Sequence, residues 1–132
     1  MKGWRIGHIG GTPLLLARSW PIGVLVLGAF YVTGLMSSMP LVEAIGYSII
    51  AVLGLFASVL AHEVSHGLAG RALRRPPEAY TLTLWGGHTT FRAPEGRPRD
   101  MALIAAAGPA SNLVLALLFW LLLVALRGAP IW

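Results

Sequence analysis

The sequence predicts an α-helical integral membrane protein with three transmembrane helices and a small cytoplasmic-side β-sheet made of two hairpins. Apolar residues form 56% and charged residues 11% of the 132 residues, which differs strongly from soluble domains. The stretches 19–42, 44–61 and 101–126 contain no Asp, Glu, Lys or Arg, and a bilayer core requires about 20 helical residues. We therefore expect a multi-pass protein of the cell membrane, built as a single unit over residues 1–132.

The N-terminal part is expected to form a hairpin followed by the first membrane helix. Gly10 and Gly11 separate two short apolar-rich runs, which indicates a hairpin over about 4–16. The first helix is expected over about 19–39. Its apolar run is too long for a signal peptide, and no cleavage pattern followed by a soluble domain is present, so this helix should remain in the mature protein.

The second helix is expected over about 42–73, because Pro76 and Pro77 cannot continue it. In residues 80–84, Tyr and Leu alternate with Thr, and Gly86 and Gly87 follow. This pattern predicts a second hairpin over about 79–92. Since an open strand edge cannot face lipid, the two hairpins should pair into one sheet at the membrane surface.

The third helix is expected over about 99–127. Its first half contains Gly108 and Pro109 among other small residues, which favours close packing against another helix and a local kink.

Basic residues predict how the chain is oriented in the bilayer. Nine of the ten Lys and Arg residues fall on one side of a three-span arrangement, and the positive-inside rule makes that side cytoplasmic. The N-terminus and the end of the second helix are then cytoplasmic. These arginines suit anionic lipid headgroups better than nucleic acid, despite the net charge of +5. The nine are Lys2, Arg5, Arg18, Arg71, Arg74, Arg75, Arg92, Arg97 and Arg99.

A candidate metal site lies near the cytoplasmic end of the second helix. His62 and His66 are one helical turn apart and share a face, with Glu63 beside them. Because the chain has no cysteine, these imidazoles are the candidate ligands of Zn²⁺, which acidifies a bound water and polarises a carbonyl. Glu63 is then the candidate general base. The alternative is a histidine-containing helix end in which Glu63 pairs with Arg71 or Arg74.

The chain resembles the site-2 proteases, a family of intramembrane zinc metalloproteases. The resemblance extends over nearly the whole chain, through "WRIGHIGGTPLLLARSW", "LAHEVSHGLAG", "TLTLWGGHTTF" and "PRDMALIAAAGPASN". It implies regulated proteolysis of transmembrane substrates, such as membrane-bound regulators, and it places Asn112 near the active site. His88, in the second hairpin, is a further candidate for contact with substrate or metal.

One feature of the family pattern is absent from the sequence. The family draws a third zinc ligand from an Asp-Gly motif in a later helix, and no such motif occurs here. Asp100 is expected to interact with the N-terminal dipole of the third helix instead. The sequence thus predicts a protease core that is incomplete at its C-terminus, and it does not decide whether this form is active. The alternative is a non-catalytic membrane module that binds a transmembrane partner. A transporter is disfavoured, because it would need polar residues spread across its spans and these are nearly absent here. The oligomeric state is not predicted.

Overall fold

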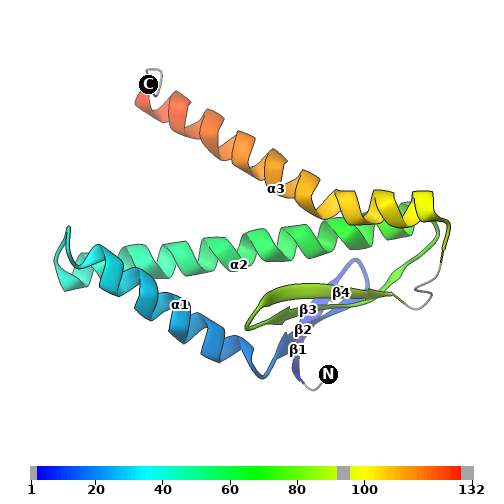
Figure 1. Cartoon of the computed structure of the whole chain (residues 1–132), viewed down its shortest axis with the longest axis horizontal. Helices are drawn as coiled ribbons and strands as arrows, with labels where there is room; N and C mark the ends of the chain where they lie inside the picture. The colour runs from blue at the N-terminus through cyan, green and yellow to red at the C-terminus, as the bar shows by residue number, and fades with distance from the viewer. Residues whose placement is uncertain (1–2, 92–95, 129–132) are drawn as a thin grey trace.

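The computed structural model describes residues 3–91 and 96–128 and contains three helices and four strands (Figure 1). The long helix α2 runs through the middle, with α3 on one side and α1 and the sheet on the other. Three helices and a small sheet are therefore confirmed. Arg92, at the predicted end of the second hairpin, lies outside the described residues. The elements are β1 (Gly3–Ile9), β2 (Thr12–Ala17), α1 (Trp20–Leu35), α2 (Leu41–Ala72), β3 (Pro77–Thr83), β4 (Gly86–Phe91) and α3 (Pro98–Arg127).

The observed helices differ more in length than the helices predicted from the sequence do. Within the described residues, α2 and α3 have 32 and 30 residues and are long and apolar enough to cross a membrane. In contrast, α1 has only 16 residues and ends at Leu35, short of the predicted 39. Pro40 disfavours helical geometry in Met39, the residue before it, so the helix could not have continued past this point. Residues 36–38 form a turn, with a hydrogen bond of 2.9 Å from the Ser38 amide to the Leu35 oxygen.

The two predicted hairpins join into one mixed sheet with the strand order β1-β2-β3-β4. The outer pairs are antiparallel, whereas β2 and β3 are parallel, with Leu14 opposite Tyr80. Gly10 and Gly11 both have positive φ, of 58° and 82°, as a tight two-residue hairpin turn requires. The pairing of β2 with β3 holds the N-terminal segment and the segment after α2 together.

The sheet packs against the C-terminal part of α2 through two glycines. A Cβ atom on Gly67 would lie 1.9 Å from the Tyr80 hydroxyl oxygen, and one on Gly70 would lie 2.6 Å from the Phe91 ring. Burial raises the pKa of the Tyr80 hydroxyl, partly opposed by the charge of Arg71. The absence of side chains at 67 and 70 therefore lets β3 and β4 approach the helix segment that carries the histidines.

Arg71 ties the end of α2 to the first hairpin. Its guanidinium donates hydrogen bonds of 2.6 Å to the backbone oxygen of Gly10 and to the hydroxyl oxygen of Thr12. Thr12 is only 2% exposed, so one of these bonds is sheltered from water. Arg71 thus positions the sheet, in place of the alternative role in which it would pair with Glu63.

Candidate metal centre

Three side chains of α2 form the candidate metal centre. The ligand atoms of His62, Glu63 and His66 all lie within 4.8 Å of one another. The two imidazoles are half-buried and the Glu63 side chain is buried, with 6% of its surface exposed. The helix alone accounts for this grouping, because residues four apart in an α-helix lie on the same face.

Both histidines have an acceptor at Nδ1. Nδ1 of His66 lies 2.6 Å from the backbone oxygen of Ile104, and Nδ1 of His62 lies 2.5 Å from Oδ1 of Asn112. The Asn112 amide nitrogen donates a hydrogen bond of 2.9 Å to the Ser58 hydroxyl, which orients its oxygen toward His62. Each Nδ1 therefore carries the proton, and each Nε2 keeps a free lone pair, as metal-ligating histidines require.

Gly108 of α3 leaves room beside these two nitrogens. A Cβ atom at this position would lie 2.5 Å from Nε2 of His62 and 2.5 Å from Nε2 of His66. Both nitrogens thus border the same small space, which only a residue without a side chain keeps open. Neutral imidazole nitrogens are preferred zinc ligands, so the residues present fit this ion.

Strand β4 holds the carboxylate of Glu63. The Thr89 hydroxyl lies 2.7 Å from Oε2 of Glu63 and 2.9 Å from its backbone oxygen, so it can donate its proton to either. A Cβ atom on Gly87 would lie 3.2 Å from Cγ of Glu63, so the strand backbone also lies close. The sequence analysis missed Thr89. The alternation of β4, which directs residues 87, 89 and 91 to one face, is the signal that could have identified it.

The remaining candidate residues lie in different positions relative to this centre. Asn112 contacts His62 directly, and its role in an active site stays a prediction. His88 alternates with Gly87 and Thr89 in β4, so its side chain points to the face of the sheet away from α2. Asp100 lies in the first turn of α3. Within residues 3–91 and 96–128, the group of potential metal donors contains neither His88 nor Asp100.

A hollow of about 360 Å³ opens beside the centre. His62, Glu63 and Asn112 form its polar side, and Val59, Trp85 and Gly86 are among the residues that line the rest. An extended peptide that entered this hollow would bring its backbone to the His62 imidazole and the Glu63 carboxylate together.

Replacing Asn112 with Leu is expected to weaken zinc binding about 10- to 100-fold, because the His62 Nδ1 proton would lose its acceptor. Asn112→Asp keeps an acceptor of similar size and should retain most of the affinity. Competition with a chromophoric chelator, on protein purified in detergent, measures both variants. An Asn112→Leu variant with unchanged zinc affinity would contradict this role of the amide.

Comparison with known proteins gives a family and two named relatives. Residues 50–131 match Peptidase family M50. The chain is 39% identical over 74 residues to Rip3 of Mycobacterium tuberculosis, covering 56% of this chain and 19% of Rip3. It is 32% identical over 118 residues to sll0528 of Synechocystis, covering 86% of this chain and 30% of that protein. Both relatives are named as proposed zinc metalloproteases. No solved structure matches the chain.

These matches confirm the resemblance to site-2 proteases, and zinc is the metal that the family and the names of the relatives imply. The chain spans less than a third of the length of these curated relatives. The family match covers more than half of the chain and includes the His62, Glu63 and His66 segment as well as Gly108 and Asn112. The chain belongs to Peptidase family M50, the site-2 protease family.

Proposed function

We propose that this chain acts as an intramembrane zinc metalloprotease of the site-2 type. The single observation that best supports the proposal is the pair of imidazoles with both Nδ1 atoms bound to acceptors and both Nε2 atoms beside Gly108. A buried carboxylate lies within the same cluster. A helix end with a merely structural role would not need this combination.

In the proposed reaction, His62 and His66 hold zinc through their Nε2 atoms. Zinc held by these residues would supply a Lewis acid that polarises the carbonyl of a peptide bond and acidifies a water molecule. Glu63 accepts the proton of that water and then transfers it to the leaving amine. Thr89 keeps the Glu63 carboxylate in place from β4. Catalytic zinc usually has three protein ligands, so we propose that a further donor comes from outside the cluster described here.

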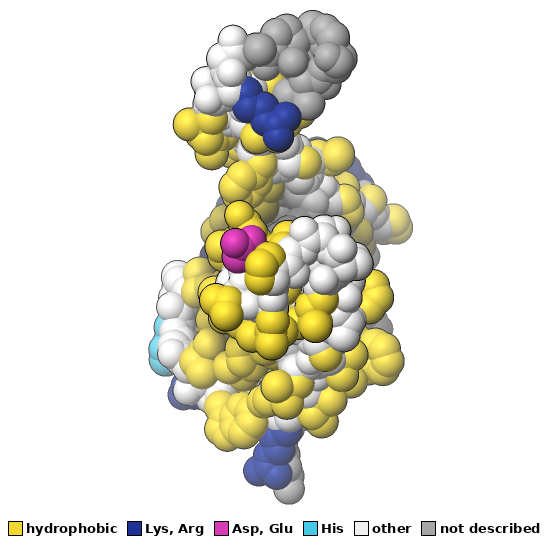
Figure 2. Space-filling view, turned by 90° about the vertical axis from the view of Figure 1, so that its left-hand side faces the viewer, with side chains coloured by type: hydrophobic (Ala, Val, Ile, Leu, Met, Phe, Trp, Pro, Cys, Tyr) yellow, Lys and Arg dark blue, Asp and Glu magenta, His cyan; other side chains and the backbone are white. Residues whose placement is uncertain are grey.

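The proposed substrate is a transmembrane protein, such as a membrane-bound regulator. The fold supports this in two ways. Hydrophobic side chains cover the face at the turn between α1 and α2, and charged side chains are few there (Figure 2). In addition, β4 is an edge strand beside the centre, so its free edge can pair with an unwound, extended segment of the substrate.

We further propose that the chain is a multi-pass protein with its N-terminus and metal centre on the cytoplasmic side. Because β2 pairs with β3, the N-terminal hairpin and the segment after α2 must lie on the same side of the bilayer. The helices α1 and α2 together then cross the membrane and return. With 16 residues, α1 is about 24 Å long, and the turn that follows it completes the crossing.

Reporter fusions test this topology. A reporter fused after residue 75 should be active on the cytoplasmic side, and one fused after residue 132 on the extracytoplasmic side, because the basic loops remain inside. A reporter fused to the N-terminus should also be active on the cytoplasmic side. An N-terminus on the opposite side from residue 75 would contradict the pairing of β2 with β3 across one membrane face.

Zinc content and cleavage, measured on the same preparation in liposomes, test the function. We expect a chelator to remove the bound zinc readily, since two imidazoles hold it. We also expect His66→Ala to abolish zinc binding. Cleavage of a transmembrane substrate should disappear with the zinc and return when zinc is restored. Zinc that resists chelation would show a third protein ligand within the chain.

A second function is favoured by the shortage of ligands in the described cluster. In it, the chain binds a transmembrane partner without cutting it. Tight substrate binding without cleavage, in a preparation that retains stoichiometric zinc, would favour this non-catalytic role over the protease.

A further inference from the structure

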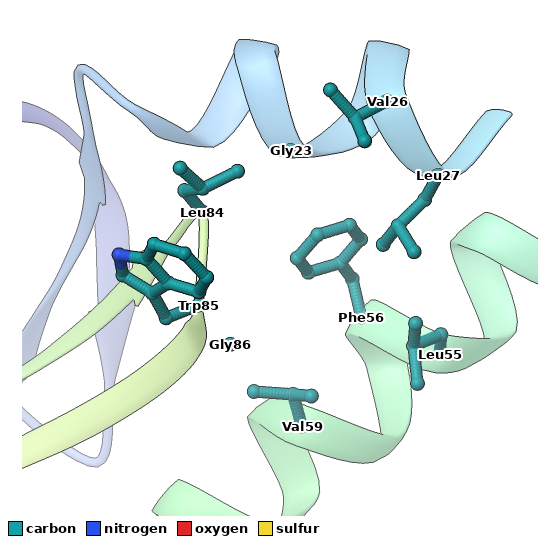
Figure 3. Close-up of a pocket in the computed structure, with 9 residues that line it drawn as sticks. All are labelled: Gly23, Val26, Leu27, Leu55, Phe56, Val59, Leu84, Trp85 and Gly86. Carbon is teal, nitrogen blue, oxygen red and sulfur yellow. The ribbon is translucent and has the colours of Figure 1, made fainter. Parts of the chain in front are cut away.

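An apolar pocket of about 400 Å³ adjoins the hollow at the metal centre (Figure 3). Its walls come from α1, α2 and the turn between β3 and β4. Four of its lining residues also line the hollow that contains His62 and Glu63. The pocket and the hollow therefore lie next to each other. The shared residues are Leu55, Val59, Trp85 and Gly86.

The walls of this pocket are apolar and well supported. Phe56, at the centre of Figure 3, is 6% exposed and packs edge-on against Trp20, with ring centroids 5.4 Å apart. Leu84 packs closely on α1, since a Cβ atom on Gly23 would lie 3.0 Å from the Leu84 Cα. The lining contains no charged side chain. An occupant of this pocket must therefore be apolar.

We propose that the pocket is a specificity subsite that receives a large apolar side chain of the substrate, next to the bond that is cut. This inference rests on the function proposed above. A peptide whose carbonyl lies at His62 and Glu63 has neighbouring residues only about 3.3–3.6 Å further along the chain, and Leu55 and Val59 line both the hollow and the pocket, so a neighbouring side chain is within reach of the pocket. The volume lies within the range of about 300–1,000 Å³ that is usual for ligand pockets. The position of the pocket directly beside the metal centre favours a peptide side chain over a lipid acyl chain, which has no reason to lie next to the zinc ligands.

Soluble peptide hydroxamates test the subsite by binding, without any cleavage. The hydroxamate group binds zinc, and the peptides differ only in carrying Ala or Phe beside it. On zinc-loaded protein, the Phe peptide should bind about 10-fold tighter or more, because its ring leaves water for the pocket.

Three variants of α1 test whether the pocket causes the preference for Phe. Leu27 lines the pocket but not the hollow, so Leu27→Trp should fill the pocket and remove most of the preference for Phe. Leu25 is 72% exposed and lines neither space, so Leu25→Trp is a matched control that should keep the preference. Leu27→Ala enlarges the pocket and should shift the preference from Phe towards Trp, which provides a test that does not depend on the tolerance of the bulkier variant.

Several results would overturn the subsite. Equal affinities for the Ala and Phe peptides would do so, and this is the result expected if the pocket holds only a lipid acyl chain. A preference for Phe that persists unchanged in both Leu27→Trp and Leu27→Ala would place the side chain elsewhere.

A zinc-independent measurement separates this inference from the proposed function. If no hydroxamate binds, the proposed zinc centre is wrong. A peptide without hydroxamate that carries a photoreactive benzoylphenylalanine is then crosslinked to the metal-free protein, and the labelled residues are mapped by mass spectrometry. Labelling at Leu27, Phe56 or Val59 supports the subsite, whereas labelling confined to other surfaces refutes it.

Discussion

Glu63→Gln is expected to lose proteolysis by about 10²–10⁴-fold or more while zinc remains bound. Gln has nearly the same size as Glu, and its amide oxygen can still accept the hydrogen bond that Thr89 donates at 2.7 Å. It cannot, however, accept a proton from water or deliver one to the leaving amine. The loss should therefore appear in the rate of cleavage and not in the metal content or the fold.

Cleavage of one transmembrane substrate in liposomes, with zinc determined on the same samples, measures this prediction. Glu43→Gln is the matched control, because Glu43 is an exposed acidic residue in the first turn of the same helix. This control should cleave like the unaltered chain. Substantial cleavage by Glu63→Gln would remove Glu63 from the proposed mechanism. Loss of zinc from it would instead mean that the carboxylate serves as a ligand.

The spatial grouping of the two histidines and the glutamate could be predicted from the sequence because it is local, whereas their roles as zinc ligands and general base stay a prediction. His62, Glu63 and His66 lie within two turns of one helix, so the geometry of the helix alone brings them together. The joining of the two hairpins was also predicted, from the cost of leaving strand edges open in lipid. In both cases a general physical constraint acts on residues whose element was clear from the sequence.

The supporting contacts could not be predicted because they come from other elements. Ile104 contributes a backbone oxygen to His66, which has no side-chain signature in a sequence. Thr89 reaches Glu63 from a strand 26 residues away, and its role depends on the register of β4 against α2. Gly108 was expected to serve packing alone, whereas the structure places it against both Nε2 atoms. Such roles depend on how α3 and the sheet dock onto α2.

Gly108→Ala is expected to abolish measurable zinc binding without unfolding the chain. The added methyl carbon would lie 2.5 Å from Nε2 of both His62 and His66, which is well inside van der Waals contact and within the space beside both lone pairs. The higher helix propensity of alanine, by about 1 kcal/mol, opposes the steric cost that Pro109 imposes on a Cβ atom at the preceding residue, so we expect α3 to remain folded. The imidazoles can relieve the contact only by turning away, which would break their Nδ1 hydrogen bonds to Asn112 and Ile104.

Zinc titration against a competing chelator, with circular dichroism as a check of helix content, measures this effect. Gly54→Ala is the matched control, because an added Cβ at Gly54 in α2 meets no atom within 4 Å, and it should bind zinc like the unaltered chain. Gly108→Ala and Glu63→Gln should then differ in kind: the first loses the metal and therefore cleavage, whereas the second loses cleavage alone. Unchanged zinc affinity in Gly108→Ala would show that the ion does not occupy the space between the two Nε2 atoms and α3. The metal would then have to lie on the β4 side of the histidines, and the arrangement of the centre derived from Gly108 would be wrong.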